Sequence, residues 1–180
     1  MINRKIARRY AKALLNIGEE DGGYETYLEE IEGVASLLDR EHILREVLVN
    51  PAFDLPQRRA ILSDLASRLG LSPVIGSVIQ LLLHKNRLIY LPDIAAVYRD
   101  LVDEMIGRAR AHLVTAYELP PEKVEDLADA LETLVQKKVV LRVDQDPSLI
   151  GGVVATIGDR IYDGSLKTQL ANMRQRLAKG

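Results

Sequence analysis

The sequence contains no cysteine and no tryptophan, so it can hold neither a disulfide framework nor a thiolate metal site. Aromatic residues make up only 4% of the chain. A hydrophobic core must therefore be built from leucine, isoleucine, valine and alanine, which favours packed helices over a large β-sandwich. The lack of cysteine also fits an intracellular, reducing setting.

Long hydrophobic runs are missing as well. No stretch approaches the roughly 20 apolar residues that are needed to span a bilayer, and the N-terminus has no signal-peptide stretch. We therefore expect no direct membrane insertion, and the missing transit peptide favours a bacterial over an organellar origin. The formal net charge of −2 gives no overall attraction to nucleic acid or anionic lipid.

The first half of the chain shows the periodicity of helices. Apolar residues recur every three to four positions, and Asn50-Pro51 and Gly70 break the pattern. Asp54 and Ser72 are candidate N-caps. The expected helices cover about 3–20, 24–38, 43–49, 55–69, 73–86 and 92–106. Residues 1–107 are therefore predicted to form a compact six-helix bundle.

The periodicity changes after Gly107. Residues 109–117 alternate as a strand does, and a helix is expected after Pro120. Two further strands are expected over 139–143 and 149–157, the second interrupted by Gly151-Gly152, which indicates a bulge or a close backbone approach. Gly158-Asp159 predicts a hairpin turn, and Ser165 caps a last helix. Residues 108–180 thus read as a small α+β domain with a short sheet and two helices, and the whole chain as α+β.

Candidate chemical sites are few. His42, His84 and His112 lie in separate elements without metal-ligand spacing. The aspartates near the expected hairpin do not match a calcium loop, and turn chemistry explains them more simply; they are Asp144, Asp146, Asp159 and Asp163. Gly151-Gly152 is not followed by the Lys-Ser/Thr pair of a phosphate loop. We expect no catalytic residue, no cofactor and no metal.

Two helices have more apolar circumference than a bundle helix needs. On the first, apolar residues cover an arc of roughly 220° and basic residues one of roughly 140°, at about 100° per residue. The fifth has an apolar arc of roughly 200°. A helix on one core needs only about 100° or somewhat more. Either both helices are central in the bundle, or their spare edges form a groove that accepts an amphipathic helix.

The basic arc of the first helix allows a different interpretation. It holds Arg4, Lys5, Arg8, Arg9 and Lys12, which could bind RNA in a helical adaptor protein. Glu19, Glu20 and Asp21 follow closely, however, and Tyr10 is the only nearby aromatic residue. A solvated polar face explains the arc better, and RNA binding is kept as the alternative function.

Six fragments along the chain resemble the delta subunit family of F-type ATP synthases, called oligomycin-sensitivity-conferring protein in mitochondria. They are Ala7 to Leu14, Asn50 to Phe53, Leu83 to Leu88 with Leu91-Pro92 and Tyr98, Ala111 to Ala116, Leu149 to Val153, and Asp163 to Ser165. Thr115, where many members have serine, is a minor departure. The fragments occur in the family's order over the full length.

The resemblance implies a non-catalytic connector in the stator of the ATP synthase. Residues 1–107 would bind the N-terminal helix of an alpha subunit on the catalytic head, in a groove between the first and fifth helices. Residues 108–180 would bind the C-terminal end of the b subunits of the peripheral stalk. One copy per complex is implied, held peripherally at the cytoplasmic face of the bacterial membrane, with no nucleic acid among its partners.

The resemblance also names the residues expected to line this groove. They are Ile6, Tyr10, Ala13, Leu14, Ile17, Val78, Ile79, Leu82 and Leu83. Ala13 is expected to matter because it is small, so that a helix can approach closely. Gly151, Gly152, Asp163 and Gly164 are expected to be structural, with the stalk contact near them.

Overall fold

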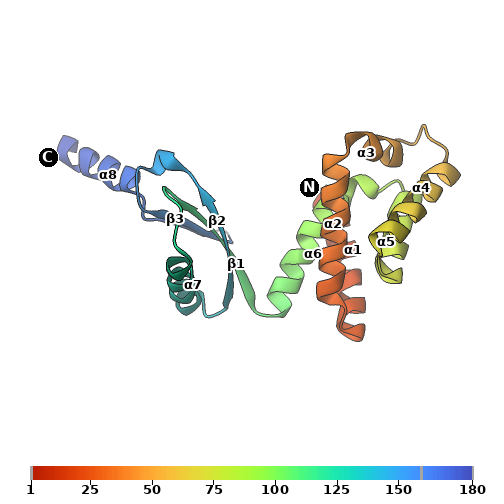
Figure 1. The fold of residues 1–180 in the computed structure, drawn as a ribbon, viewed down its shortest axis with the longest axis horizontal. Helices are drawn as coiled ribbons and strands as arrows, with labels where there is room; N and C mark the ends of the chain where they lie inside the picture. The colour runs from red at the N-terminus through yellow and green to blue at the C-terminus, as the bar shows by residue number, and fades with distance from the viewer. Residues whose placement is uncertain (1, 159, 180) are drawn as a thin grey trace. The chain divides into compact units, whose positions relative to one another are not determined.

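A computed structural model describes residues 2–158 and 160–179 of the chain. The chain separates into two compact units, Met1–Val102 and Asp103–Gly180 (Figure 1). The division falls inside the sixth helix, α6 (Leu91–Met105), whereas the sequence placed it at Gly107. Each unit is described by itself below.

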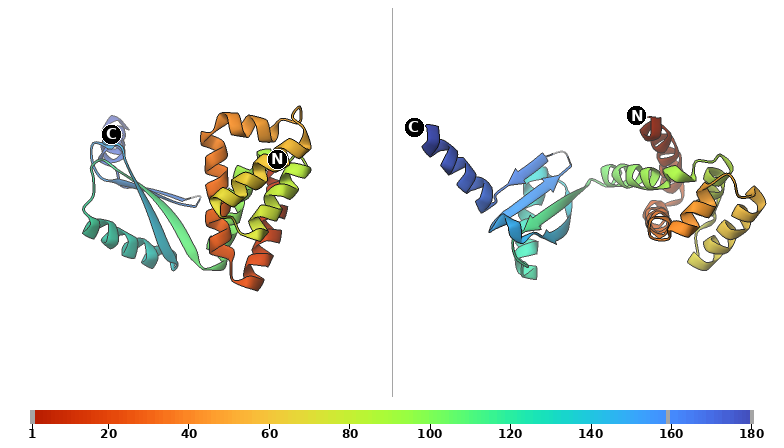
Figure 2. Two further views of the ribbon diagram at one scale, coloured as in Figure 1. Left: turned by 45° about the vertical axis from the view of Figure 1, so that its right-hand side comes forward. Right: turned by 90° about the horizontal axis from the view of Figure 1, so that it is seen from above.

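The first unit is the expected bundle of six α-helices (Figures 1 and 2). Besides α6, its helices are α1 (Ile2–Asp21), α2 (Tyr24–Arg40), α3 (His42–Val49), α4 (Leu55–Leu69) and α5 (Pro73–His84). A 3-10 turn, η1 (Leu88–Tyr90), precedes α6. The six-helix prediction is therefore confirmed.

Most of the predicted helix ends are present, with one exception. The Ser72 hydroxyl accepts the Ile75 N–H at 3.3 Å at the start of α5, and Gly70 ends α4 in the left-handed conformation, at φ 64°. Asp54 occupies the N-cap position of α4, but its side chain makes no capping hydrogen bond. The predicted position of the N-cap is therefore correct, but the predicted capping hydrogen bond is absent. A position next to the start of a helix does not fix the rotamer of the side chain.

The core of the first unit is aliphatic apart from Tyr27 and Tyr98, and Tyr98 is fully buried. Its hydroxyl donates to the Tyr24 carbonyl at 3.1 Å, and burial raises the pKa of this phenol well above its ordinary value. Around it lie Ile31, Leu48, Ile75, Ile79, Leu82, Leu91 and Ile94, each with at most 1% of its surface exposed. This packing fixes the helices that carry the candidate surface.

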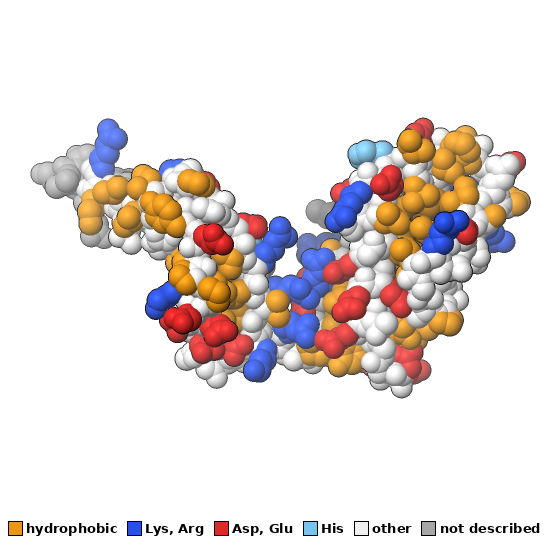
Figure 3. Space-filling view, in the orientation of Figure 1, with side chains coloured by type: hydrophobic (Ala, Val, Ile, Leu, Met, Phe, Trp, Pro, Cys, Tyr) orange, Lys and Arg blue, Asp and Glu red, His pale blue; other side chains and the backbone are white. Residues whose placement is uncertain are grey.

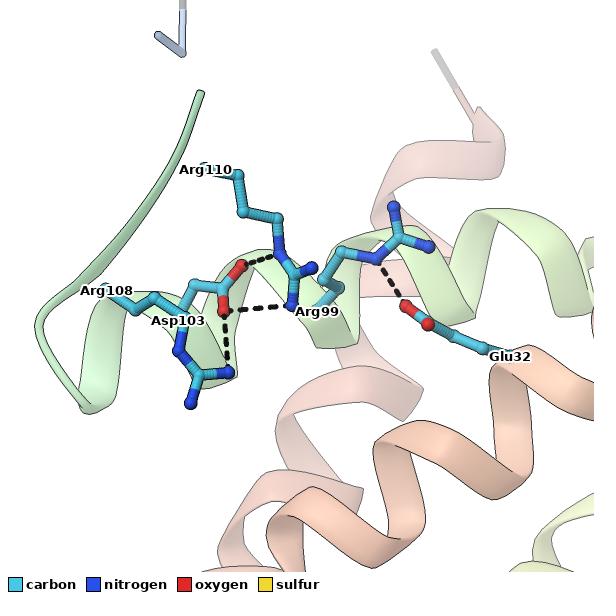
Figure 4. A network of polar contacts seen from close by, with 5 residues as sticks. All are labelled: Glu32, Arg99, Asp103, Arg108 and Arg110. Carbon is cyan, nitrogen blue, oxygen red and sulfur yellow. Dashed lines mark hydrogen bonds and ion pairs between the residues drawn. The ribbon is translucent and has the colours of Figure 1, made fainter. Parts of the chain in front are cut away.

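Two arginines tie helices of the first unit together. Arg99 of α6 forms an ion pair with Glu32 of α2 (Figure 4). Arg58 of α4 is only 4% exposed, and its Nη1 donates to the Leu48 carbonyl at 3.2 Å near the end of α3. A cation at this end of a helix is stabilised by the helix dipole, which helps to explain a buried arginine.

The second unit contains a four-stranded sheet and two helices. In chain order these are β1 (Arg108–Thr115), α7 (Pro121–Val135), β2 (Lys138–Gln145), β3 (Val153–Ile157), β4 (Arg160–Asp163) and α8 (Leu166–Lys179). The strands lie in the order β2-β1-β3-β4. β1 pairs parallel to β2 and antiparallel to β3, which forms a hairpin with β4. The predicted α+β domain is confirmed.

One face of this sheet is covered by α7. The β1 residues Ala111, Leu113 and Thr115 alternate along this face and are buried, and α7 lies against the sheet in Figures 1 and 2. At the start of β1, Arg110 donates to Asp103 at 2.5 and 3.2 Å (Figure 4). This bidentate pair secures a carboxylate that is only 7% exposed.

The strand expected over 149–157 begins later than predicted. Pro147–Leu149 is a 3-10 turn, η2, and β3 starts only at Val153. Gly151-Gly152 therefore precedes the strand instead of interrupting it, which corrects the sequence interpretation. The expected close backbone approach is present, since a Cβ on Gly152 would lie 2.3 Å from the Gly164 carbonyl oxygen. Asp159, in the predicted hairpin turn, lies outside the described residues.

The start of α8 is held by side-chain capping. The Ser165 hydroxyl accepts the Thr168 N–H at 3.2 Å, as the sequence predicted, and Ser165 is 1% exposed. Beyond this point α8 leads away from the sheet in Figure 1 and in the right-hand view of Figure 2. No helix in the described part of the chain is long and apolar enough to cross a bilayer.

Candidate partner-binding surface

Helix α1 presents one apolar stripe to the core of the first unit. Ala7 and Ala11 have no exposed surface, and Leu14 has 1%. Gly18 continues the stripe where α1 meets the start of α2, and a Cβ there would lie 2.9 Å from the Tyr24 Cα. Small residues along this stripe let α1 lie close to its neighbours, which uses about a third of the helix circumference.

A second apolar stripe on α1 is only partly covered by the chain. Ile6, Tyr10, Ala13 and Ile17 follow the four-three-four spacing that places residues on one helix face, roughly 100° around the helix from the core stripe. Ile6 and Tyr10 are half-buried, whereas Ala13 is exposed and Ile17 is 40% exposed. This second stripe, called the α1 stripe below, is apolar surface that the bundle leaves partly exposed.

Helix α5 leaves much less apolar surface free than its composition suggests. Ile79, Leu82 and Leu83 are at most 1% exposed. Val78 is half-buried, and Leu81 is 46% exposed. Of the nine residues expected to line a groove, four are therefore core residues in the structure: Leu14, Ile79, Leu82 and Leu83. Leu81 was not among the nine, because an apolar arc of roughly 200° does not show which of its edges faces outward.

A contact at Tyr10 joins the α1 stripe to the end of α5. The Arg87 Nη1 donates to the Tyr10 hydroxyl at 2.9 Å, and the Arg87 guanidinium carbon lies 5.9 Å from the centre of the ring. The guanidinium carbon of Arg9 lies 6.0 Å from the same centre. Tyr10 therefore has a positive group on its own helix and another from the segment after α5.

The backbone after α5 fixes where Arg87 stands. Asn86 adopts a left-handed conformation, at φ 52°, its N–H bonds to the Leu83 carbonyl at 3.0 Å, and the Arg87 N–H bonds to the Leu82 carbonyl at 2.8 Å. These bonds form a Schellman cap, in which asparagine is tolerated at the left-handed position. The predicted helix end at Asn86 thus also positions Arg87, a residue that the sequence did not single out.

The histidines and aspartates do not form a metal site in the described part of the chain. His42 is exposed, and His84 Nδ1 lies 3.2 Å from Arg59 Nη2. Asp146 accepts the Ser148 N–H at 2.9 Å, which is the turn chemistry that the sequence indicated. Asp159, one of the four aspartates considered, lies outside the described residues.

The face of the sheet opposite α7 carries mixed charge. His112 Nε2 of β1 lies 2.7 Å from Asp144 Oδ2 of β2, and Arg142 Nε lies 3.6 Å from the same oxygen. The hydrogen bond with His112 and the nearby Arg142 charge lower the pKa of the Asp144 carboxyl. Val140 and Ile161 on this face are 42% and 69% exposed, so the face is accessible within its unit.

Helix α8 exposes a further apolar stripe. Leu166, Leu170 and Met173 are 45%, 56% and 59% exposed, and their spacing places them on one face of the helix. Hydrophobic side chains cover much of the described part of α8 in Figure 3. An apolar stripe of this kind on a helix of a small domain indicates a surface for another protein.

Comparison with known proteins identifies the family. The family model described as ATP synthase delta (OSCP) subunit matches residues 6–177, which includes both units. The chain belongs to the ATP synthase delta (OSCP) subunit family. The resemblance seen in the six sequence fragments is thereby confirmed.

Relatives of the ATP synthase delta family match the whole chain. The ATP synthase subunit delta of Desulfosudis oleivorans is 43% identical over 180 residues, which is 100% of this chain and 98% of that protein. The ATP synthase subunit delta of Desulfatibacillum aliphaticivorans is 44% identical over 99% of this chain and 98% of its own length. These relatives are bacterial proteins named as delta subunits, and none of the comparisons supports RNA binding.

A solved structure has the same fold. A chain of the Toxoplasma gondii mitochondrial ATP synthase hexamer superposes with a TM-score of 0.71, covering 96% of this chain and 97% of that one. Sequence identity is 20%, so the likeness concerns the fold. The fold of this chain is therefore shared with a chain of a mitochondrial ATP synthase.

Proposed function

We propose that this chain is a non-catalytic connector in the stator of a bacterial ATP synthase. Its first unit binds the N-terminal helix of an alpha subunit on the catalytic head, and its second unit binds the C-terminal end of the b-subunit stalk. One copy joins each complex and is held at the cytoplasmic face of the membrane by these partners. The chain resists the torque of the rotor and performs no chemical step itself.

The observation that carries this proposal is the α1 stripe. Ile6, Tyr10, Ala13 and Ile17 form a continuous apolar face, although α1 already has a separate stripe for its own core. Val78 and Leu81 add partly exposed apolar surface on α5, and Tyr10 contacts the segment after α5 through Arg87. Amphipathic helices bind to apolar surfaces of this form.

The energetics are adequate for a load-bearing contact. Burial of apolar surface contributes about 25 cal/mol per Å², and association costs at least about 4 kcal/mol. A helix that removes about 600 Å² of apolar surface from water gains about 15 kcal/mol, which offsets an association cost of about 15 kcal/mol as well. Ala13 lies in the middle of the α1 stripe and is exposed, so a partner helix can approach closely there.

The second unit offers a separate surface for the stalk. The exposed stripe of α8, Leu166, Leu170 and Met173, lies on the helix that follows the hairpin. The sequence placed the stalk contact near this region. Two independent surfaces on two units are what a connector requires, because a contact on one unit can form without disturbing the other.

The variant Ala13→Asp tests the head contact. Ala13 is exposed in the free chain, so the variant folds normally, but a docked helix would bury an unpaired charge. We expect binding of a peptide with the alpha-subunit N-terminal sequence to weaken by at least about 2 kcal/mol, measured by calorimetry.

Ala60→Asp is the matched control for that experiment. Ala60 is exposed on α4, outside the proposed surface, and the same substitution there should leave peptide affinity unchanged. Equal affinity of Ala13→Asp and the unmodified chain, with circular dichroism showing an intact fold, would remove the α1 stripe from the binding site.

A further inference from the structure

Two arginine side chains lie close to Tyr10, and a purely apolar partner helix would leave their positive charges without a binding partner. The guanidinium carbons of Arg9 and Arg87 lie 6.0 and 5.9 Å from the ring centre. Within the described part of the chain neither group forms an ion pair with a carboxylate. Two guanidinium groups therefore lie about 6 Å from the centre of one aromatic ring in the α1 stripe, and neither forms an ion pair within the described part of the chain.

The tyrosine ring does not compensate these charges. Both distances lie at the outer limit of cation–π attraction, about 6 Å. An arginine side chain has five N–H donors, and the hydrogen bond to the Tyr10 hydroxyl uses one donor of Arg87. Arg9 is exposed and Arg87 is half-buried, so donors of both remain available to a ligand.

We propose that the helix docked on the α1 stripe carries a carboxylate side chain that binds between Arg9 and Arg87, beside Tyr10. This inference rests on the proposed function and specifies its partner: an amphipathic helix with an acidic position within its contact face. Ile6 and Ala13 lie about one turn before and after Tyr10 on the same face. The partner's acidic residue therefore has apolar contact residues about one turn away on either side.

The backbone positions of both arginines are fixed before a partner binds. Arg9 stands on a continuous helix, and the Schellman cap at Asn86 fixes the backbone of Arg87 through the hydrogen bonds to Leu82 and Leu83. A carboxylate that reaches both guanidinium groups accepts charge-assisted hydrogen bonds from them, and these are stronger than neutral ones. Such a contact sets the register of the docked helix, since a shift by one residue would remove the carboxylate from both groups.

A carboxylate on a helix fits this site better than the phosphates of RNA or lipid. The two arginines border an apolar stripe, and a polyanion would leave Ile6, Ala13 and Ile17 without a partner. Arg8 belongs to the basic arc of α1 and lies roughly 160° around the helix from Tyr10, whereas Arg9 lies at the edge of that arc that is nearest to the α1 stripe.

The test uses calorimetry on the full chain with a synthetic peptide of the N-terminal segment of the same organism's alpha subunit. Arg9→Gln and Arg87→Gln remove the charge and keep a donor, and Arg8→Gln removes the same charge elsewhere on α1. We expect each of the first two variants to bind about tenfold more weakly at low salt, with a smaller salt dependence. Arg8→Gln should bind as the unmodified chain does.

Changing the peptide identifies the carboxylate. Each acidic residue of the peptide is replaced in turn by its amide. One replacement should weaken binding to the unmodified chain about tenfold and should have almost no further effect on the Arg9→Gln/Arg87→Gln double variant. This double-mutant cycle shows that the acidic residue and the two arginines interact.

The possible failures are distinguishable. If the peptide binds all variants equally well, the carboxylate contact is overturned and the head-binding function stands. If the unmodified chain does not bind the peptide at all, both are overturned. If phosphatidylglycerol vesicles or single-stranded RNA bind in a manner that depends on Arg9 and Arg87, while peptide affinity does not, the two arginines serve phosphate and the inference is wrong.

Discussion

At the scale of single residues, Gly152 allows the segment before β3 to lie close to the start of α8 in the second unit. It adopts φ 81°, and a Cβ on it would lie 2.3 Å from the Gly164 carbonyl oxygen. The neighbouring Gly151 carbonyl accepts the Leu166 N–H at 2.9 Å, and the Val153 carbonyl accepts the Gly164 N–H at 2.9 Å. The segment before β3 is therefore attached directly to the start of α8.

Gly152→Ala is expected to destabilise the second unit by about 2–4 kcal/mol, because it adds backbone strain and a steric clash. Gly158→Ala is the matched control, since Gly158 also has a positive φ, 56°, but has open space around it. That variant should cost about 1–2 kcal/mol. Chemical denaturation of both variants measures the difference, and equal costs would show that the close approach to Gly164 is unimportant.

Asp163 makes the capping of α8 sensitive to pH. Its carboxylate accepts the Ser165 N–H at 2.9 Å and the Thr168 hydroxyl at 2.7 Å, and these bonds lower the pKa of the carboxyl below its ordinary value. A lowered pKa in the folded state means that the ionised form stabilises the fold. This stabilisation is complete above the ordinary pKa of aspartate, about 3.9, and is lost as the pH falls through the lowered value.

Thr168→Val should raise the pKa of Asp163 toward the ordinary value, because it removes one hydrogen-bond donor. Carbon-detected NMR titration of the side-chain carboxyl measures this pKa directly. The difference in stability between the unmodified chain and the variant should be present at pH 6 and should narrow in acid. A pKa that is the same in both proteins would mean that the Thr168 hydroxyl does not bind the carboxylate in solution.

At the scale of elements, α1 and α5 show what sequence patterns can and cannot predict. The breaks at Gly70, Ser72-Pro73 and Asn86 are local signals, and the helices end near them in the structure. The face of α5 that is buried depends on which helices surround it, and an almost continuous apolar arc contains no information about that choice. Val78 and Leu81 could therefore not be separated from Ile79 and Leu82.

Side-chain contacts between distant segments were also beyond sequence analysis. Tyr10 and Arg87 are 77 positions apart, and neither residue type indicates the other. The β-strands were predicted where alternation was clear, as in β1, whereas the start of β3 was misplaced because η2 and Gly152 continue an apolar run without being extended strand. In these cases the sequence predicted features that depend on neighbouring residues, but it did not predict which distant segments contact each other.

The exposed stripe of α8 is expected to bind the stalk. Leu170→Asp places a charge in the middle of this stripe, since Leu170 is 56% exposed between Leu166 and Met173, and should abolish binding of a C-terminal b-subunit fragment. Gln169→Asp changes the adjacent exposed position and should bind normally. Surface plasmon resonance compares the two variants, and normal binding by Leu170→Asp would place the stalk contact elsewhere.

At the scale of the whole molecule, the chain consists of two units, each with its own candidate surface. The first unit is an aliphatic bundle whose α1 carries apolar side chains on two faces, and the second is a small sheet domain from which α8 leads away. Mechanical connection requires that both surfaces be occupied at once. It does not require any reacting group on this chain.

The most direct test of the connector function is proton-driven ATP synthesis by membrane vesicles whose ATP synthase has been depleted of this subunit. The account predicts that the unmodified chain and Ala60→Asp restore synthesis, whereas Ala13→Asp does not, although the catalytic heads still hydrolyse ATP in every case. Restoration of synthesis by Ala13→Asp to the level of the unmodified chain would contradict the claim that the α1 stripe holds the head.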